Sequence, residues 1–312
     1  MKFLKIVFAF ALVELLSSPF GGDREGVAFS QQDAQYSQYM FNPLAINPAY
    51  AGSRDVFSSA LVYRNQWTNI KDAPVTAAWS AHTPLRQDRI GIGAEIFSDK
   101  LGPRSASAFL FSYAYRFPLF SGKLALGLRM GMIDYVYDMS KLDFKDPADV
   151  FNTGAASSKI SGTGDFGILY YSSTFYFGLS NTHLNRGRMS EFMGDSARQA
   201  PHYFMTLGKA FKVGKTIVNP VFALKQAKNA PSSSDLGVNI LLRERWWLGF
   251  SFRSQYGLVL LTQYMITDKF RVGYSYDVGG NAIGRAGGGS HEVMIGYDVN
   301  IAGPKVSMPR YL

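Results

Sequence analysis

The sequence predicts an all-β protein: a transmembrane antiparallel β-barrel of a bacterial outer membrane, with about fourteen strands. Only 18% of its 312 residues are charged, against roughly a quarter in a typical soluble protein, whereas 15% are aromatic. From residue 57 onward, short segments alternate apolar and polar side chains, which is the pattern of strands. Long and short connections between these segments also alternate, as they do in outer-membrane barrels.

The first residues are typical of a secretory signal peptide. Lys2 and Lys5 precede a short apolar stretch that is interrupted by Glu14, so the stretch is not a spanning helix. Small residues place the predicted cleavage before Gln31, with Ser18 as the alternative site. Cysteine is absent, which excludes a lipoprotein anchor and any disulfide.

Each alternating segment has one large apolar face and one face that is mostly small, polar or charged. In the segment 270–277, one face carries Phe270, Val272, Tyr274 and Tyr276, and the other carries Arg271, Gly273, Ser275 and Asp277. A soluble sandwich would also alternate, with its apolar face in a core. Aromatic residues near the segment ends and glycines on the polar face favour a membrane barrel whose apolar face contacts lipid.

Fourteen segments can be counted: 57–66, 74–82, 90–98, 106–117, 123–134, 163–171, 174–180, 201–211, 216–224, 235–243, 245–253, 257–266, 270–276 and 290–299. Connections after even-numbered segments are mostly short, and those after odd-numbered segments are mostly long. This pattern places both termini and the short turns in the periplasm. The connection at 254–256 is short where a long one is expected, so twelve strands is the alternative number.

The predicted organisation has four parts: a signal peptide at 1–30, a periplasmic N-terminal segment at 31–56, the barrel at 57–301 and a short tail at 302–312. The second part does not alternate, and it contains the turn-forming pairs Asn42-Pro43 and Asn47-Pro48. We interpret it as a periplasmic lip or as a plug in the lower opening of the barrel.

The sequence predicts no cofactor, no metal site and no enzymatic activity. None of the four histidines stands at metal-ligand spacing from another: His82, His183, His202 and His291. An outer-membrane lipid hydrolase is an alternative, because Ser190, Ser196 and Asp195 share a loop with His183, but such loop residues are ordinary turn formers.

The charged residues have a simpler interpretation than catalysis or nucleic-acid binding. The net charge is +9, yet the basic residues are scattered singly, which favours lumen lining and contacts with anionic lipid and lipopolysaccharide over nucleic acid. Glu95 and Asp165 are interpreted as lumen charges that pair with Arg64, Arg129 or Arg253.

A specific resemblance begins at Gln38–Gly52, which reads Gln-Tyr-Met-Phe-Asn-Pro-Leu-Ala-Ile-Asn-Pro-Ala-Tyr-Ala-Gly. It continues through Tyr63–Trp67, Ala73–Thr76, Gly91–Gly93, Asp99–Pro103, Gly178–Ser180 with His183, Gly273–Asp277 and His291–Tyr297. These motifs resemble the PorP/SprF family of the type IX secretion system in Bacteroidota. The resemblance spans nearly all of the chain after the predicted leader.

The resemblance implies an outer-membrane role in protein secretion and gliding motility. Its implied partners are periplasmic ring or peptidoglycan-associated lipoproteins of type IX secretion, a cargo adhesin with a C-terminal signal domain, or both. The candidate partner-binding residues are Tyr39, Phe41, Asn42, Asn47, Tyr50, Arg64 and Trp67. Packing of the N-terminal segment against the barrel wall is the alternative role for them.

A diffusion porin or a hydrophobic-solute channel is the alternative function, since fourteen-stranded barrels of that kind exist. Such a pore needs an open polar lumen. Trp247, Leu241 and Leu169 instead indicate a partly filled one.

Overall fold

The computed structural model describes residues 33–85, 89–146, 148–149, 152, 154–190, 197–227, 230–254 and 256–300. The predicted signal peptide and the predicted tail at 302–312 lie outside these residues. No helix in the described ranges is long and apolar enough to cross a membrane.

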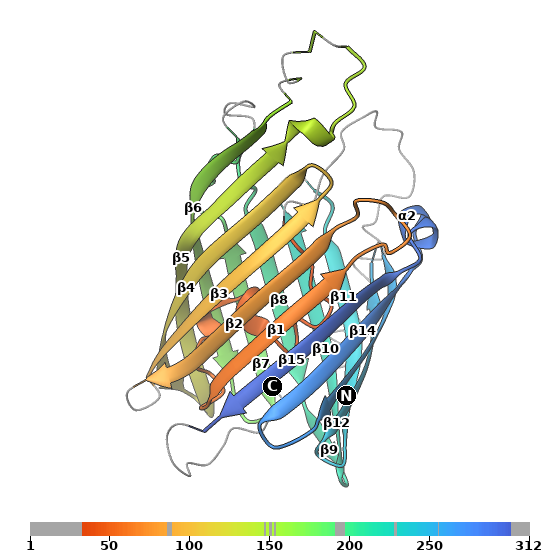
Figure 1. The fold of residues 1–312 in the computed structure, drawn as a ribbon. Helices are drawn as coiled ribbons and strands as arrows, with labels where there is room; N and C mark the ends of the chain where they lie inside the picture. The colour runs from red at the N-terminus through yellow and green to blue at the C-terminus, as the bar shows by residue number, and fades with distance from the viewer. Residues whose placement is uncertain are drawn as a thin grey trace.

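The strands form one closed antiparallel barrel (Figure 1). They are β1 (Phe57–Asn65), β2 (Val75–Leu85), β3 (Ile90–Leu101), β4 (Arg104–Leu119), β5 (Gly122–Asp138), β6 (Ala156–Tyr171), β7 (Phe175–Thr182), β8 (His202–Lys209), β9 (Phe211–Val213), β10 (Thr216–Ala227), β11 (Ser233–Leu242), β12 (Trp246–Arg253), β13 (Gly257–Met265), β14 (Phe270–Gly279) and β15 (Ser290–Val299). Pairing of β1 with β15 and of β10 with β11 completes the ring, which leaves no free edge in the membrane.

The barrel wall has fourteen strands. The elements β8 and β9 pair with the same neighbour, β10, and only Ala210 separates them, so the fifteen labelled strands make fourteen positions. The predicted number is therefore confirmed, and the alternative of twelve is wrong.

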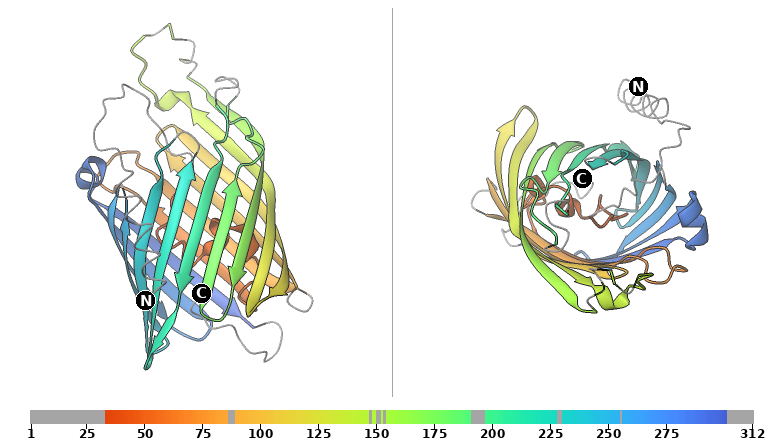
Figure 2. Two further views of the ribbon diagram at one scale, coloured as in Figure 1. Left: turned by 180° about the vertical axis from the view of Figure 1, so that it is seen from behind. Right: turned by 90° about the horizontal axis from the view of Figure 1, so that it is seen from above.

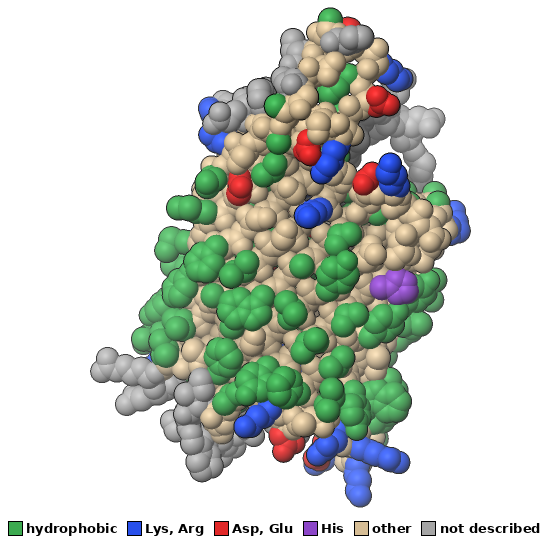
Figure 3. Space-filling model, in the orientation of Figure 1, with side chains coloured by type: hydrophobic (Ala, Val, Ile, Leu, Met, Phe, Trp, Pro, Cys, Tyr) green, Lys and Arg blue, Asp and Glu red, His purple; other side chains and the backbone are tan. Residues whose placement is uncertain are grey.

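The apolar side chains point outward, toward lipid. On β5, Met130 and Met132 are 67% and 66% exposed, whereas Ala125 and Arg129, on the opposite face, are buried. Apolar side chains cover much of the barrel wall, and charged ones gather toward its two ends (Figure 3). This inside-out alternation is what a lipid-facing wall requires.

The two ends of the barrel differ in their connections. One end has tight turns such as those that join β4 to β5, β6 to β7 and β9 to β10. The other end carries the longer connections 139–155, 183–201 and 280–289; the first of these includes the 3₁₀ turn η3 (Met139–Lys141), and the last includes α2 (Ala282–Ala286). In outer-membrane barrels the short turns face the periplasm. The described chain ends at that side, after β15 (Figure 1).

Several strands extend beyond their predicted ends. The hairpin of β5 and β6 pairs as far as Asp138 and Ala156, well beyond the predicted ends, and rises above the neighbouring strands (Figure 1). The β6 part of this extension contains Ser157, Ser158 and Lys159 and has one large apolar residue, Ile160, which is why alternation did not detect it. The strands β3 and β4 also continue to a tight turn, where Gly102 has a φ of +55°.

Residues 33–56, which we call the lumen segment, lie inside the barrel (Figure 2). They begin beside the long-connection ends of β7 and β8, form the 3₁₀ turns η1 (Pro43–Ala45) and η2 (Pro48–Tyr50), and enter β1 at the short-turn end. A Cβ added at Gly91 would lie 2.0 Å from the Ala51 carbonyl oxygen, and one at Gly127 would lie 2.2 Å from the Ala49 nitrogen. These two inward-facing glycines therefore make room for the lumen segment.

Candidate functional site: the filled lumen

A buried cluster of charges holds the start of the lumen segment. The guanidinium of Arg64, on β1, donates to Asp277 Oδ2 at 2.7 Å and to Glu292 Oε2 at 3.2 Å. Glu292 accepts from the backbone nitrogens of Ser37 and Gln38, at 2.8 and 2.9 Å. Three wall strands (β1, β14 and β15) and the lumen segment thus share one network. Each buried charge in it is compensated, as burial requires.

A second network holds the middle of the lumen segment. Arg129 on β5 pairs with Asp165 on β6 at 2.5 Å and with Glu95 on β3 at 3.0 Å. The same guanidinium donates to the carbonyl oxygens of Leu44 and Ala45, each at 3.1 Å. The predicted pairing of Glu95 and Asp165 with a lumen arginine is confirmed, and that arginine is Arg129.

Near the short-turn end, the wall binds the lumen segment through its backbone. Arg116 donates to the Ala51 carbonyl at 2.7 Å, and the Gly52 nitrogen donates to His82 Nδ1 at 3.1 Å. Arg54 of the lumen segment pairs with Asp298 of β15 at 3.2 Å. The attachment therefore extends over the height of the barrel.

The Asn-Pro pairs shape the lumen segment. Asn47 caps η2, because its Oδ1 accepts from the Ala49 nitrogen at 2.9 Å, while its Nδ2 donates to the Ile168 carbonyl at 3.1 Å. Asn42 precedes η1, and its Oδ1 accepts from Ser80 Oγ at 2.9 Å. Proline at the first position of each turn fixes a φ that suits a helical turn.

Aromatic residues also pack between the lumen segment and the barrel wall. Phe41 packs on Trp247 with ring centroids 6.1 Å apart, and Tyr50 meets the His82 ring edge-on at 5.5 Å. Tyr39 is 8% exposed and so is buried in the same contact. Trp247, which the sequence indicated as lumen filling, is itself buried.

Six of the seven predicted partner-binding residues lie on this contact between segment and wall: Tyr39, Phe41, Asn42, Asn47, Tyr50 and Arg64. Trp67 is separate, in the connection between β1 and β2, where its backbone nitrogen donates to Ser290 Oγ at 3.3 Å. The contacts of the six support the packing role. A partner-binding role for the seven stays a prediction.

A cavity of about 110 Å³ remains in the lumen beside the start of the lumen segment. Its lining includes Asp33, Tyr36, Glu95, Arg129 and His183. Apolar side chains such as Leu110 and Ile133 make up most of the rest of the lining, and the lumen segment bounds the recess on one side.

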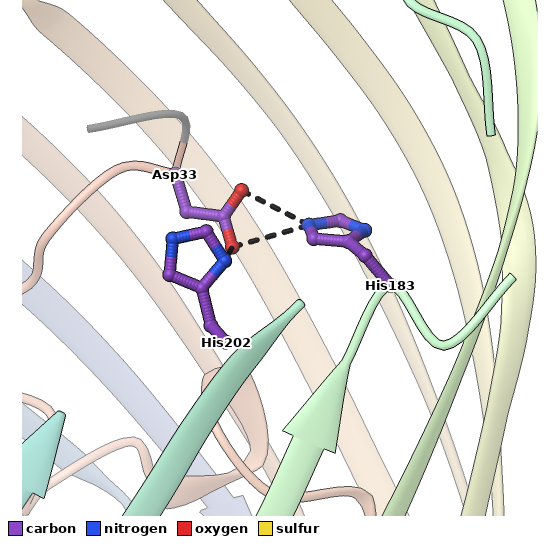
Figure 4. Close-up of side chains that lie close together, drawn as sticks. All are labelled: Asp33, His183 and His202. Carbon is purple, nitrogen blue, oxygen red and sulfur yellow. Dashed lines mark hydrogen bonds and ion pairs between the residues drawn. The ribbon is translucent and has the colours of Figure 1, made fainter. Parts of the chain in front are cut away.

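Asp33, His183 and His202 meet at the edge of this recess (Figure 4). The Asp33 carboxylate lies 3.0 Å from His183 Nε2 and 3.2 Å from His202 Nδ1. Burial acts to raise the pKa of Asp33, but the two histidines hold that pKa well below its usual range. Burial acts to lower the pKa of His183, and the Asp33 carboxylate outweighs burial and raises it.

The sequence did not predict this cluster. His183 and His202 are far apart in sequence and stand on either side of the long connection between β7 and β8, while Asp33 belongs to the lumen segment. Strand pairing brings Thr182 opposite His202, so the two histidines became neighbours only once the register of β7 and β8 was known.

Comparison with known proteins decides the family. The sequence profile described as "Type IX secretion system membrane protein PorP/SprF" matches residues 28–297, which is most of the chain. The chain belongs to the PorP/SprF family. It is an outer-membrane protein of type IX secretion, so the predicted family and location are confirmed. The comparison with curated proteins found no match.

Solved structures similar to this PorP/SprF chain include three outer-membrane proteins at low sequence identity. The Acinetobacter baumannii outer membrane protein Omp33 is 8% identical with a TM-score of 0.45, over 79% of this chain and 99% of that one. The P. putida toluene transporter TodX is 9% identical with a TM-score of 0.45, over 83% and 94%. The KdgM porin is 6% identical with a TM-score of 0.39, over 78% and 99%.

Proposed function

We propose that this PorP/SprF protein is a docking component of type IX secretion that binds periplasmic lipoproteins of the secretion machinery at its short-turn end. The observation that carries the proposal is the filled lumen. The networks centred on Arg64 and Arg129 attach the lumen segment to strands around the ring. A barrel filled in this way serves better as a rigid membrane anchor than as a pore.

The short-turn end offers a surface for an acidic partner. The β9–β10, β11–β12 and β13–β14 turns carry five exposed basic residues and two acidic ones: Lys212, Lys215, Arg243, Arg245 and Lys269, against Glu244 and Asp268. The hairpin of β9 and β10 reaches furthest at this end (Figure 1), and it exposes Phe211 and Val213 beside its lysines. Exposed apolar residues flanked by positive charge favour a protein partner that supplies acidic groups.

Complementation of a gene deletion tests the proposal. The deletion strain receives either the wild-type gene or Lys212→Glu/Lys215→Glu, which reverses the charge of the hairpin tip. The matched control, Lys141→Glu/Lys145→Glu, makes the same charge change on exposed lysines of the connection at the opposite end. We expect the hairpin variant to lower export of signal-bearing cargo, measured by quantitative proteomics of the culture medium, and the control variant to restore it.

Two outcomes would contradict the proposal. Export of every cargo at the wild-type level in the deletion strain would remove the secretion role. Full complementation by the hairpin variant, with normal amounts of folded barrel in the outer membrane, would remove the short-turn end as the docking surface. Folding is checked by the shift in gel mobility between heated and unheated samples.

Single-channel recording tests the porin alternative. The recess of about 110 Å³ is small beside an aqueous channel, and residues of the lumen segment line it. We expect the purified barrel in a planar bilayer to give no large steady conductance. Such a conductance in the wild type would favour the diffusion porin.

The proposed role involves no reaction. His183, the histidine of the hydrolase alternative, contacts Thr163 Oγ1 at 2.8 Å and the Asp33 carboxylate at 3.0 Å. Ser196 and Asp195 of that alternative lie outside the described residues. Hydrolysis of a lipid ester by the purified barrel, above that of a His183→Ala variant, would contradict a non-enzymatic role.

A further inference from the structure

The cluster of Asp33, His183 and His202 has the donors of a metal site. It offers two imidazole nitrogens and one carboxylate oxygen, all within 4.8 Å of one another (Figure 4). Asp33 Oδ2 lies 3.1 Å from His183 Nε2 and 3.2 Å from His202 Nδ1. Two donors bound to Zn²⁺ at about 2.0–2.1 Å in a tetrahedron lie roughly 3.3 Å apart, so these two distances are close to those of a bound ion.

The surroundings orient His183 as they orient metal-bound histidines. Its Nδ1 contacts Thr163 Oγ1 at 2.8 Å, and its backbone nitrogen donates to Asp165 Oδ1 at 2.8 Å. With Nδ1 engaged by a hydroxyl, Nε2 is left to face the carboxylate. In metal sites, a hydrogen bond to the ring nitrogen that does not bind the metal fixes the orientation and the tautomer of the histidine.

His202 supplies an independent observation. Its side chain is completely buried, and the polar groups that reach its ring are the Asp33 carboxylate and the backbone of Ala200. One backbone carbonyl can satisfy only one of the two ring nitrogens, and burial leaves the other in need of a partner such as the carboxylate or an ion. The Nδ1 atom already points toward Asp33 at 3.2 Å.

We propose that Asp33, His183 and His202 bind a divalent transition-metal ion of the Zn²⁺ type. The donor set of two histidines and one carboxylate suits Zn²⁺, and it leaves a further coordination position that water can fill from the recess. Bound there, the ion joins the start of the lumen segment to both sides of the β7–β8 connection. This site does not depend on the docking role.

The positive charge of Lys225 lies near the cluster and weakens the binding of a cation there, so its removal tests the site. The Lys225 ammonium lies 5.7 Å from the centroid of the Phe204 ring, and that ring stacks on His202 at 6.4 Å. The other two carboxylates that line this part of the recess, Asp165 and Glu95, form ion pairs with Arg129. Replacing Lys225 by methionine removes a positive charge from the neighbourhood, so Lys225→Met tightens metal binding.

The experiment uses the full-length barrel, purified in detergent without a polyhistidine tag and stripped with a chelator. Zn²⁺ binding is measured by calorimetry, and Co²⁺ is added as a spectroscopic probe of coordination by nitrogen and oxygen. We expect one Zn²⁺ per wild-type chain and none at this site in His202→Ala. The matched control is His291→Ala, because His291 contacts Tyr274 and Tyr276, away from the cluster.

Two further variants keep the proposal open to refutation if a ligand variant folds poorly. Thr163→Val keeps all three ligands and weakens Zn²⁺ affinity by about 10–100-fold, as loss of an orienting partner does elsewhere. Zn²⁺ also raises the unfolding temperature of the wild type but not that of Asp33→Asn. Substoichiometric binding by the wild type, or equal affinity in folded wild type and His202→Ala, would overturn the site.

Discussion

At the scale of the residue, the lumen is organised by arginines that each bind several partners. Lumen charges were predictable because charged residues recur on the small, polar face of the strands. The partners of these charges were not predictable. Arg64 and Asp277 are separated by 213 positions, and the sequence does not indicate which backbone groups of the lumen segment accept or donate hydrogen bonds. The same holds for His183 and His202, whose meeting with Asp33 depends on strand register and on the path of the lumen segment.

Removal of Arg64 tests the energetic role of these networks. Arg64→Ala leaves Glu292 buried without its cation and leaves Asp277 with Arg253 alone, at 3.5 Å, and breaking a buried pair in this way costs about 3–5 kcal/mol. We expect that loss in the free energy of unfolding, measured by urea titration in lipid vesicles. The control is Arg245→Ala, whose exposed pair with Asp268 at 4.0 Å contributes about 0–1 kcal/mol. Equal losses in the two variants would show that the buried network is not needed for stability.

At the scale of the element, the strands were largely predictable and the lumen segment was only partly so. A strand that faces lipid must place an apolar residue at every second position, and this rule located all fourteen strands. The upper parts of β5 and β6 leave that environment, and their alternation is lost with it. Asn42-Pro43 and Asn47-Pro48 indicated turns, but the depth of the lumen segment in the barrel depends on glycines of distant strands such as Gly127.

The fit of the lumen segment can be tested at Gly127. In Gly127→Val the new side chain meets the backbone of Ala49, so we expect the lumen segment to be displaced. The chain has no cysteine, so Ser53→Cys gives one labelling site at a buried position of the segment. We expect maleimide to label Ser53→Cys faster when Gly127→Val is added to the same chain. Gly164→Val is the control: a Cβ at Gly164 meets no atom within 4 Å, so labelling of Ser53→Cys stays slow. Unchanged labelling with Gly127→Val would refute this close fit.

The lipid-facing surface gives a second prediction for strands. Met130 lies at the middle of β5 and is 67% exposed, so Met130→Arg places a charge near the bilayer midplane and costs about 2–4 kcal/mol of folding free energy. Phe120, 92% exposed in the turn before β5, is the control, and Phe120→Arg costs about 0–1 kcal/mol near the interface. Unfolding in vesicles measures both values, and a smaller cost at Met130 than at Phe120 would contradict the assigned outward face.

At the scale of the whole molecule, a rigid barrel with a filled lumen presents two different ends. The long-connection end holds the recess and the histidine cluster, and the short-turn end holds the basic hairpin of β9 and β10. The family was recognisable from the opening motif Gln38–Gly52, which lies within the lumen segment. The proposed docking surface was not recognisable, because Lys212 and Lys215 resemble the lysines of any surface turn. Only the fold places them at the tip of one end of the barrel.

Co-purification from outer membranes in mild detergent tests the docking role most directly. We predict that the wild-type barrel and Lys141→Glu/Lys145→Glu retain a periplasmic lipoprotein of the secretion machinery, and that Lys212→Glu/Lys215→Glu loses most of it at equal barrel recovery. Absence of any such lipoprotein from the wild-type sample, or equal amounts with the hairpin variant, would contradict docking at the short-turn end.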